Sequence, residues 1–278
     1  MWASLLAGAA WASACCGGGG ASVPMRPADC DHVVAGVGVS AQTALGRWDV
    51  DGRAVPTSSS EQDIVATIGA GYRPAHWGHL TLSMPAQVNR RAAGDTAAWG
   101  GGVGDVRVMA YGDPFEEDPE GWLPVPYLGV GVRAATGRAW DESDHPLLAD
   151  VTGEAGTALV ASASVERSFG RWPYGVQGDV ELPVEDRLGV APAKATALAF
   201  VGRNLGDKWT VTASVRASRT FPEDALGAGR TSAALRVVRG EKLLYRAWLG
   251  IDADLPISGL GRSFTQLGSV GAGFAIVR

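Results

Sequence analysis

The sequence has no long hydrophobic run beyond its first residues, and it has few cysteines. After residue 14, no apolar stretch approaches the roughly 18 to 20 residues that a membrane-spanning helix requires, so any membrane role must use strands. The three cysteines, Cys15, Cys16 and Cys30, all lie near the start of the chain. They can close a short loop from Cys15 or Cys16 to Cys30, but they cannot staple the main body.

Basic clusters and catalytic motifs are also missing. The formal net charge is -5, and lysine and arginine are scattered singly, so we expect no nucleic-acid partner. No G-x-S-x-G turn occurs. The close pair His76 and His79 is interpreted as polar turn residues. The acidic stretches 113–120 and 140–146 lack the spacing of a calcium loop and are interpreted as solvated turns. We expect no enzyme activity, no metal and no cofactor.

The first residues are typical of an export signal. "MWASLLAGAAWASA" is apolar and ends in Ala12-Ser13-Ala14, the small-residue pattern that signal peptidase cleaves. We therefore predict a signal peptide over 1–14, a Gly-rich linker over 15–30 and one domain over 31–278. Lipidation at Cys15 is the alternative to ordinary cleavage.

The body of the chain alternates between apolar and polar residues. In "WTVTASVRAS", Trp209, Val211, Ala213, Val215 and Ala217 alternate with polar residues, which is the period of a strand. We predict about twelve such strands, near 32–46, 60–73, 76–88, 101–112, 123–136, 153–169, 172–184, 192–204, 208–219, 229–239, 242–255 and 265–277. Many of them reach the roughly 9 to 11 residues that cross a bilayer at a tilt.

The connections between these strands alternate in length. Tight turns such as "GRW", "LGDK" and "GE" alternate with the longer connections 47–59, 89–100, 137–152, 185–191, 220–228 and 256–264. One predicted short turn, "DPFEEDPEGW", is longer than the rule allows. Outer-membrane barrels have short periplasmic turns and long external loops. The pattern therefore predicts an all-β, antiparallel, up-and-down transmembrane β-barrel.

Tryptophan and proline favour the same fold. Trp48, Trp77, Trp99, Trp122, Trp172 and Trp209 fall at predicted strand ends, as in an interfacial aromatic girdle. Met84-Pro85, Leu182-Pro183 and Leu255-Pro256 each end an odd-numbered predicted strand, and we expect them at the outer rim because proline donates no ladder hydrogen bond.

Positions opposite the apolar stripes should face the lumen. We predict that the solute path is lined by Asp105, Arg107, Tyr111, Tyr127, Arg133, Glu166, Gln177, Asp179, Glu181, Arg216, Arg236, Arg246 and Asp252. Twelve strands lie between the eight that side chains fill and the sixteen that leave a channel. Small inward residues such as Gly129, Gly131 and Ser214 favour open space.

The stretch "WGGGVGDVRVMAY" (99–111) could suggest a phosphate-binding loop. A dinucleotide site needs a strand before its glycines and a helix after them, whereas these glycines follow a polar segment and precede an alternating strand. We predict instead that Gly100 to Gly104 relax the backbone where a long outer loop joins the fourth strand.

This stretch also resembles a known family. "GGGVGDVRVMAY", preceded by a strand ending in "LSMP", looks like the outer-membrane barrel transporters of the MetA-like family associated with phenol degradation. The resemblance covers roughly residues 60 to 135. It implies passage of small, hydrophobic or aromatic molecules across the outer membrane.

These patterns predict a bacterial outer-membrane barrel in contact with lipid. The leading function is passive transport of a small solute. Two alternatives are a closed barrel, structural or binding a partner through its outer loops, and a soluble exported β-barrel that binds a ligand.

Overall fold

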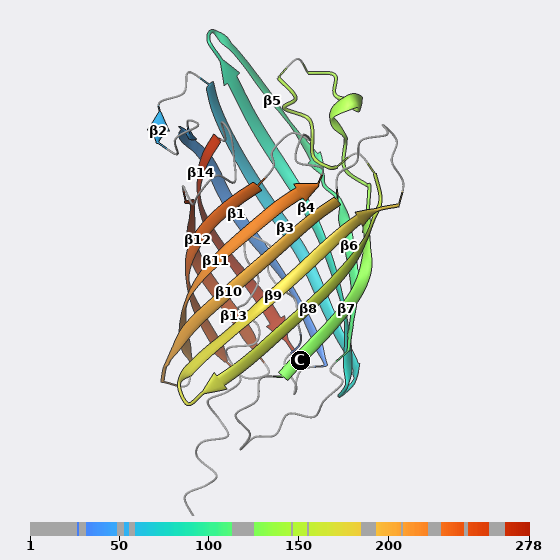
Figure 1. The fold of residues 1–278 in the computed structure, drawn as a ribbon, viewed down its shortest axis with the longest axis vertical. Helices are drawn as coiled ribbons and strands as arrows, with labels where there is room; N and C mark the ends of the chain where they lie inside the picture. The colour runs from blue at the N-terminus through green and yellow to red at the C-terminus, as the bar shows by residue number, and fades with distance from the viewer. Residues whose placement is uncertain are drawn as a thin grey trace, which may run out of the picture.

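The protein forms a single antiparallel β-barrel in a computed structural model (Figure 1). The structure describes residues 27, 32–48, 53–55, 59–112, 125–145, 147–154, 156–184, 193–206, 208–221, 229–241, 244–255 and 265–278. The predicted signal peptide, most of the linker, and the acidic stretch 113–120 lie outside these residues. No helix within them is long and apolar enough to span a membrane.

The twelve strands of the wall follow one another around the barrel in chain order. They are β1 (Val33–Trp48), β3 (Ser59–Ala75), β4 (Gly78–Ala93), β6 (Val106–Gly112), β7 (Val125–Ala134), β8 (Ala158–Phe169), β9 (Trp172–Pro183), β10 (Ala193–Leu205), β11 (Trp209–Phe221), β12 (Gly229–Glu241), β13 (Tyr245–Asp254) and β14 (Thr265–Val277). β14 pairs with β1, with Val34 opposite Val277 and Ser40 opposite Gly271, and this pairing closes the barrel. The predicted fold class is confirmed.

Three shorter elements complete the fold. β2 (Ala54–Val55) pairs with the end of β1, β5 (Thr96–Val103) pairs with β4, and the 3-10 helix η3 (Trp140–Glu142) lies between β7 and β8.

The ends of the barrel differ, as the connection lengths predict. At the end that we call the turn end, β3 joins β4, β8 joins β9, and β10 joins β11 through very short connections. Both Val33 and Val277 also lie there. The opposite end, the loop end, carries the longer connections and a projecting hairpin of β4 and β5 (Figure 1).

The projecting hairpin corrects the prediction of a long loop at 89–100. β4 continues to Ala93, turns through Gly94 and Asp95, and returns as β5 from Thr96. Gly94 adopts a φ of 57°, which glycine reaches at little cost and which suits a tight hairpin turn. Gly100, Gly101 and Gly102 therefore lie within β5, and Gly104 lies in the break before β6, so these glycines do not follow a long loop.

β5 and β6 together occupy the fourth wall position, with a bulge between them. β5 pairs with Ala86–Ala93 of β4 and β6 pairs with Gly78–Ser83, one residue out of register. Pro85 lies opposite this break, and its carbonyl accepts the N–H of Gly104 at 2.7 Å. The N–H and C=O of a strand residue point toward the same neighbouring strand. Proline has no N–H, so at position 85 the strand pairing lacks one donor. Pro85 is thus inside β4, which contradicts its predicted place at the rim, whereas Pro183 does end β9.

The two faces of the wall follow the alternation in the sequence. On β8, Val160, Ser162 and Ser164 are buried inside, whereas Leu159 and Val165 are exposed outside. Exposed outward side chains around the barrel include Ile64, Ile68, Val201, Leu249 and Ile251. A continuous apolar outer face of this kind is unusual in a soluble monomer and suits contact with lipid.

Some of the tryptophans lie at the rims of the barrel. Trp172 and Trp209 begin β9 and β11, and Trp77 lies in the β3–β4 turn, all with exposed rings at the turn end. Trp99 lies outward on the projecting hairpin. Trp48 ends β1, and Trp122 is outside the described residues.

Candidate functional site

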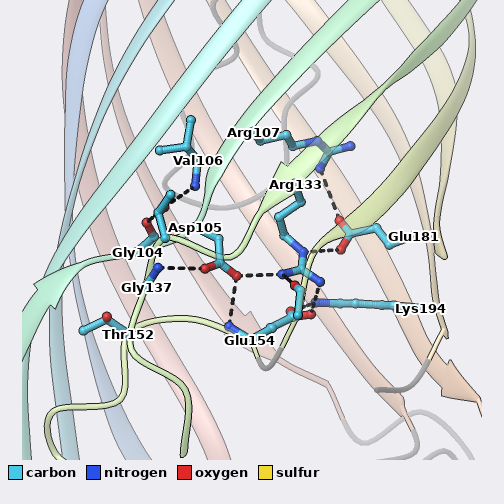
Figure 2. Close-up of polar contacts among 12 residues, drawn as sticks. Gly104, Asp105, Val106, Arg107, Arg133, Gly137, Thr152, Glu154, Glu181 and Lys194 are labelled. Atoms are coloured by element: carbon cyan, nitrogen blue, oxygen red, sulfur yellow. Dashed lines mark hydrogen bonds and ion pairs between the residues drawn. The ribbon is translucent and has the colours of Figure 1, made fainter. Parts of the chain in front are cut away.

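The inner face of the barrel carries all the side chains predicted to line a solute path. Residues that pair across a ladder share a face, so Arg107 opposite Arg133, and Gln177 opposite the buried Ser164, place both sets inside. By the same register, the inward positions are Arg107, Tyr111, Tyr127, Arg133, Glu166, Gln177, Asp179, Glu181, Arg216, Arg236, Arg246 and Asp252. Asp105 lies in the bulge, and its carboxylate also points inward (Figure 2).

Arg133 is the centre of a group of charges on this face, toward the loop end. Its guanidinium lies 2.6 Å from Asp105, 2.9 Å from Glu154 and 3.1 Å from Glu181 (Figure 2). It also donates to the carbonyl of Gly156 at 3.1 Å. The planar guanidinium suits several simultaneous charge-assisted hydrogen bonds, so Arg133 is fixed in one position.

Arg107 lies beside Arg133 but is held differently. Its guanidinium is 3.6 Å from Asp179 and 3.5 Å from Glu181, beyond the usual N–H···O range, and its side chain is 29% exposed against 13% for Arg133. Within the described residues these two ion pairs are its contacts, and no hydrogen bond is found. Arg107 can therefore offer its N–H groups to water or to a solute.

Lys194 extends the group along the wall, with its ammonium 3.5 Å from Glu154. We call Asp105, Arg107, Arg133, Glu154, Asp179, Glu181 and Lys194 the charged cluster. Arg216 reaches it from β11, where it interacts electrostatically with Asp179 and Glu181. The strand residues of the cluster and Arg216 thus come from one continuous arc of the wall, β6 to β11. Glu154 and Lys194 were not among the predicted residues.

Asp105 links the charged cluster to the chain segment between β7 and β8. One of its carboxylate oxygens accepts the N–H of Gly137 at 3.0 Å, and the other accepts the N–H of Glu154 at 2.9 Å. Thr136 adds a bond from its hydroxyl to the carbonyl of Gly104 at 2.7 Å. We call residues 135–157 the inner loop. The bulge that turns Asp105 inward therefore also anchors this loop.

The glycines of "WGGGVGD" form the surface on which the inner loop docks. A Cβ at Gly100 would lie 2.6 Å from the backbone of Ala149 and Asp150, and one at Gly104 would lie 2.9 Å from the carbonyl of Thr152. Asn89, on the facing strand, donates to the carbonyls of Ala149 and Val151, each at 2.9 Å. Close backbone approach, and not a loop junction, explains these glycines.

Within the inner loop, Arg138 and Asp150 hold the tip together. Arg138 lies 2.6 Å from Asp150 and 3.0 Å from Asp144. Burial opposes ionisation of Asp150, but hydrogen bonds from Ser143, Arg138 and the backbone outweigh it and hold its pKa well below the usual range. The bond to Asp150 in turn raises the pKa of Arg138. The side chain of Asp144 is 83% exposed, as expected for a solvated turn, and it also pairs with Arg138.

Large side chains line the lumen near the turn end. We call this region the turn half; its inward residues include Val34, Met109, Tyr127, Leu198, Phe200 and Val238, all buried. The Phe200 ring lies against Gly175, and the Tyr111 ring lies against Gly129. Met109 likewise lies against Gly131, so the space beside Gly129 and Gly131 is occupied by large neighbours and is not open.

His79 also belongs to the turn half. It lies inside on β4, buried, and its ring stacks on Tyr111 with centroids 4.8 Å apart. The interpretation of His79 as a turn residue is therefore wrong. Within the described residues, no group of His, Cys, Asp or Glu could hold a metal ion.

Two further contacts bring large side chains to the inner face at the turn end. Arg73 is buried and donates to the carbonyl of Pro27, which is itself fully buried, at 3.1 Å. Trp248 faces inward, packs on Gly273 and lies under Arg236, 4.9 Å from its guanidinium carbon. The turn half is therefore lined by large, mostly buried side chains, whereas the loop end is charged and partly accessible.

Solved structures with this fold include outer-membrane channels. An outer membrane channel from Pseudomonas putida F1 superposes with a TM-score of 0.64 at 12% identity, over 89% of this chain and 96% of that chain. The NanC porin gives 0.48 at 10% identity, over 88% and 98%. The translocator domain of the autotransporter NalP from Neisseria meningitidis gives 0.49 at 11% identity, over 88% and 87%.

The likeness to the Pseudomonas putida channel shows the fold of an outer-membrane β-barrel. The sequence matches no protein-family model and no curated relative. The resemblance to the MetA-like family therefore stays a prediction.

Proposed function

We propose that the chain is a passive channel for small solutes in a bacterial outer membrane. The observation that carries this proposal is the partly accessible Arg107, which points into the lumen beside two carboxylates with its N–H groups available. A barrel that only needed stability would gain more from apolar packing at this position, because exposed ion pairs contribute little.

In this proposal, a solute enters at the loop end and meets the charged cluster. The inner loop would narrow the mouth, since Asp105 and Arg133 hold it against the wall. The thirteen predicted lumen residues would line the path. Charges of both signs favour a narrow filter of modest selectivity over a strongly anionic or cationic pore.

The proposed solute is small and hydrophobic or aromatic. The turn half supplies apolar and aromatic contacts from Met109, Tyr127, Leu198 and Phe200. In this proposal, these side chains close the lumen at rest, and passage of a solute requires them to move.

The packed turn half also favours a second candidate, a closed barrel without transport. Met109, Tyr127 and Phe200 are as buried as residues of a protein core, and the contact of Arg73 with Pro27 would add to the closure. In that case the loop end would serve binding or structure.

Reconstitution into planar bilayers distinguishes the passive channel from the closed barrel. A channel should conduct ions in steps, and Arg107→Glu should shift the selectivity toward cations. Arg239→Glu makes the same charge change on the outer face and should leave the selectivity unchanged. A protein that refolds with heat-modifiable migration but neither conducts nor admits aromatic solutes into liposomes would be the closed barrel.

A further inference from the structure

Four arginines lie over aromatic rings on the outer face of the wall. The distances from guanidinium carbon to ring centroid are 5.1 Å for Arg203 and Trp172, 5.4 Å for Arg239 and Trp209, 5.9 Å for Arg90 and Trp99, and 5.5 Å for Arg219 and Phe221. The first two pairs lie at the turn end and the others lie toward the loop end.

The separation of these pairs matches the thickness of a bilayer. On β11, Trp209 and Arg219 mark the two levels, and the outward residues between them are Val211, Ala213, Val215 and Ala217. Ten residues span about 33 Å of strand, or about 25 Å of height at the tilt of such barrels, which is the height of their apolar band. The pairs therefore lie at the level of lipid headgroups.

The two turn-end pairs are neighbours. Arg203 on β10 is opposite Val211, and Arg239 on β12 is opposite Trp209, so the two arginines flank β11 on the same face. From the strand spacing, their Cα atoms are about 12 Å apart. One headgroup can lie between two long side chains at this separation.

These two arginines lack acidic partners among the described side chains. Their contacts there are the tryptophan rings, and the outward neighbours Phe169, Tyr174 and Leu205 carry no charge. Stacking occupies the face of a guanidinium and leaves its N–H edge free, and that edge matches a phosphate bidentately. A cation at the edge of an apolar band is stabilised by an anion.

We propose that Arg203 and Arg239 bind the phosphate of a phospholipid in the leaflet at the turn end. Trp172 and Trp209, about half exposed, pack beside its glycerol region. An anionic phospholipid such as phosphatidylglycerol binds better than phosphatidylcholine, whose choline neutralises the phosphate. The site goes beyond the proposed channel function and holds whether or not the barrel conducts.

Native mass spectrometry of the refolded barrel in micelles with defined phospholipids tests this site. The wild type should retain phosphatidylglycerol in preference to phosphatidylcholine. Each Arg203→Gln or Arg239→Gln change should weaken retention about fivefold, and the double variant more than tenfold. Arg219→Gln removes a ring-stacked arginine at the other rim and should change retention little.

Heat-modifiable migration checks that each variant is folded, and the single variants serve if the double variant does not refold. The site would be overturned if the folded Gln variants retained phosphatidylglycerol like the wild type. It would also be overturned if the wild type held both lipids equally.

Discussion

The loop-end and turn-end halves of the lumen differ in how their inward side chains are satisfied. At the loop end, Arg107 and Glu154 are partly exposed, and the inward charged side chains form ion pairs with one another. In the turn half, Met109 and Phe200 are buried against the walls. Both halves use the same alternating strands, so the wall does not decide whether the lumen is open.

The two halves differ in which groups pack against their inward glycines. In the turn half, the rings of Tyr111 and Phe200 pack on Gly129 and Gly175 of the neighbouring strands. At the loop end, Gly100 and Gly104 receive the backbone of the inner loop. Small residues on an inner face thus mark places that another part of the chain fills, and they do not by themselves predict a pore.

The largest expected effect is in the turn half. Phe200→Ala removes a buried ring and should lower the free energy of unfolding by about 3 to 5 kcal/mol. Lys194→Ala, on the same strand in the loop-end half, should cost less than about 1 kcal/mol. Denaturant unfolding in micelles measures both. Equal losses would mean that the halves are packed alike.

Within the charged cluster, substitutions of Arg133 and of Arg107 should have different effects. Arg133→Gln leaves Asp105 and Glu181 without their closest cation and should cost about 1 to 3 kcal/mol. Arg107→Gln should cost less than about 1 kcal/mol and instead change ion selectivity. The same unfolding assay and bilayer recordings compare them. A larger stability loss at Arg107 than at Arg133 would reverse the roles of the two arginines.

Docking of the inner loop should depend on Gly100. Gly100→Val places atoms against Ala149 and Asp150, and overpacking of this kind costs about 1 to 3 kcal/mol. The loop should then be cut faster by protease within 137–154. Gly112→Ala, where a Cβ meets nothing within 4 Å, is the control. Unchanged cleavage of the Gly100 variant would rule out this docking surface.

The smallest expected effect is a pH dependence of the same loop. Because the folded pKa of Asp150 is lowered, its contribution is fully present above the unfolded pKa of about 3.9 and is lost as the pH falls through the folded value. Protease protection should therefore stay constant from about pH 8 to about pH 5. Asp150→Asn should weaken it across that range. Loss of protection near pH 5 in the wild type would contradict the ion pair with Arg138.

The strands could be predicted because lipid requires apolar side chains on one face. The predicted segment 208–219 matches β11 closely, since every second residue from Trp209 had to be apolar. β5 gave no such signal, because apolar and polar residues do not alternate in "TAAWGGGV". Only the turn at Gly94 and Asp95 indicated it.

The parity of the strands also placed the charged residues inside, but not what they touch. Glu154 reaches Arg133 from a loop, and Gly100 meets Ala149 across about fifty residues of sequence, with no local pattern that connects them. His79 lay too close to a turn for its face to be read. Contacts between distant segments fix these features, and spacing along the chain does not contain them.

Accessibility of two inward positions on β6 tests the difference between the halves most directly. In a background with Cys15, Cys16 and Cys30 changed to serine, Arg107→Cys and Met109→Cys place one thiol in each half. A membrane-impermeant methanethiosulfonate should modify the thiol at 107 quickly and the thiol at 109 slowly or not at all. Equal, fast modification of both would show that the turn half is open and would contradict its closure by packed side chains.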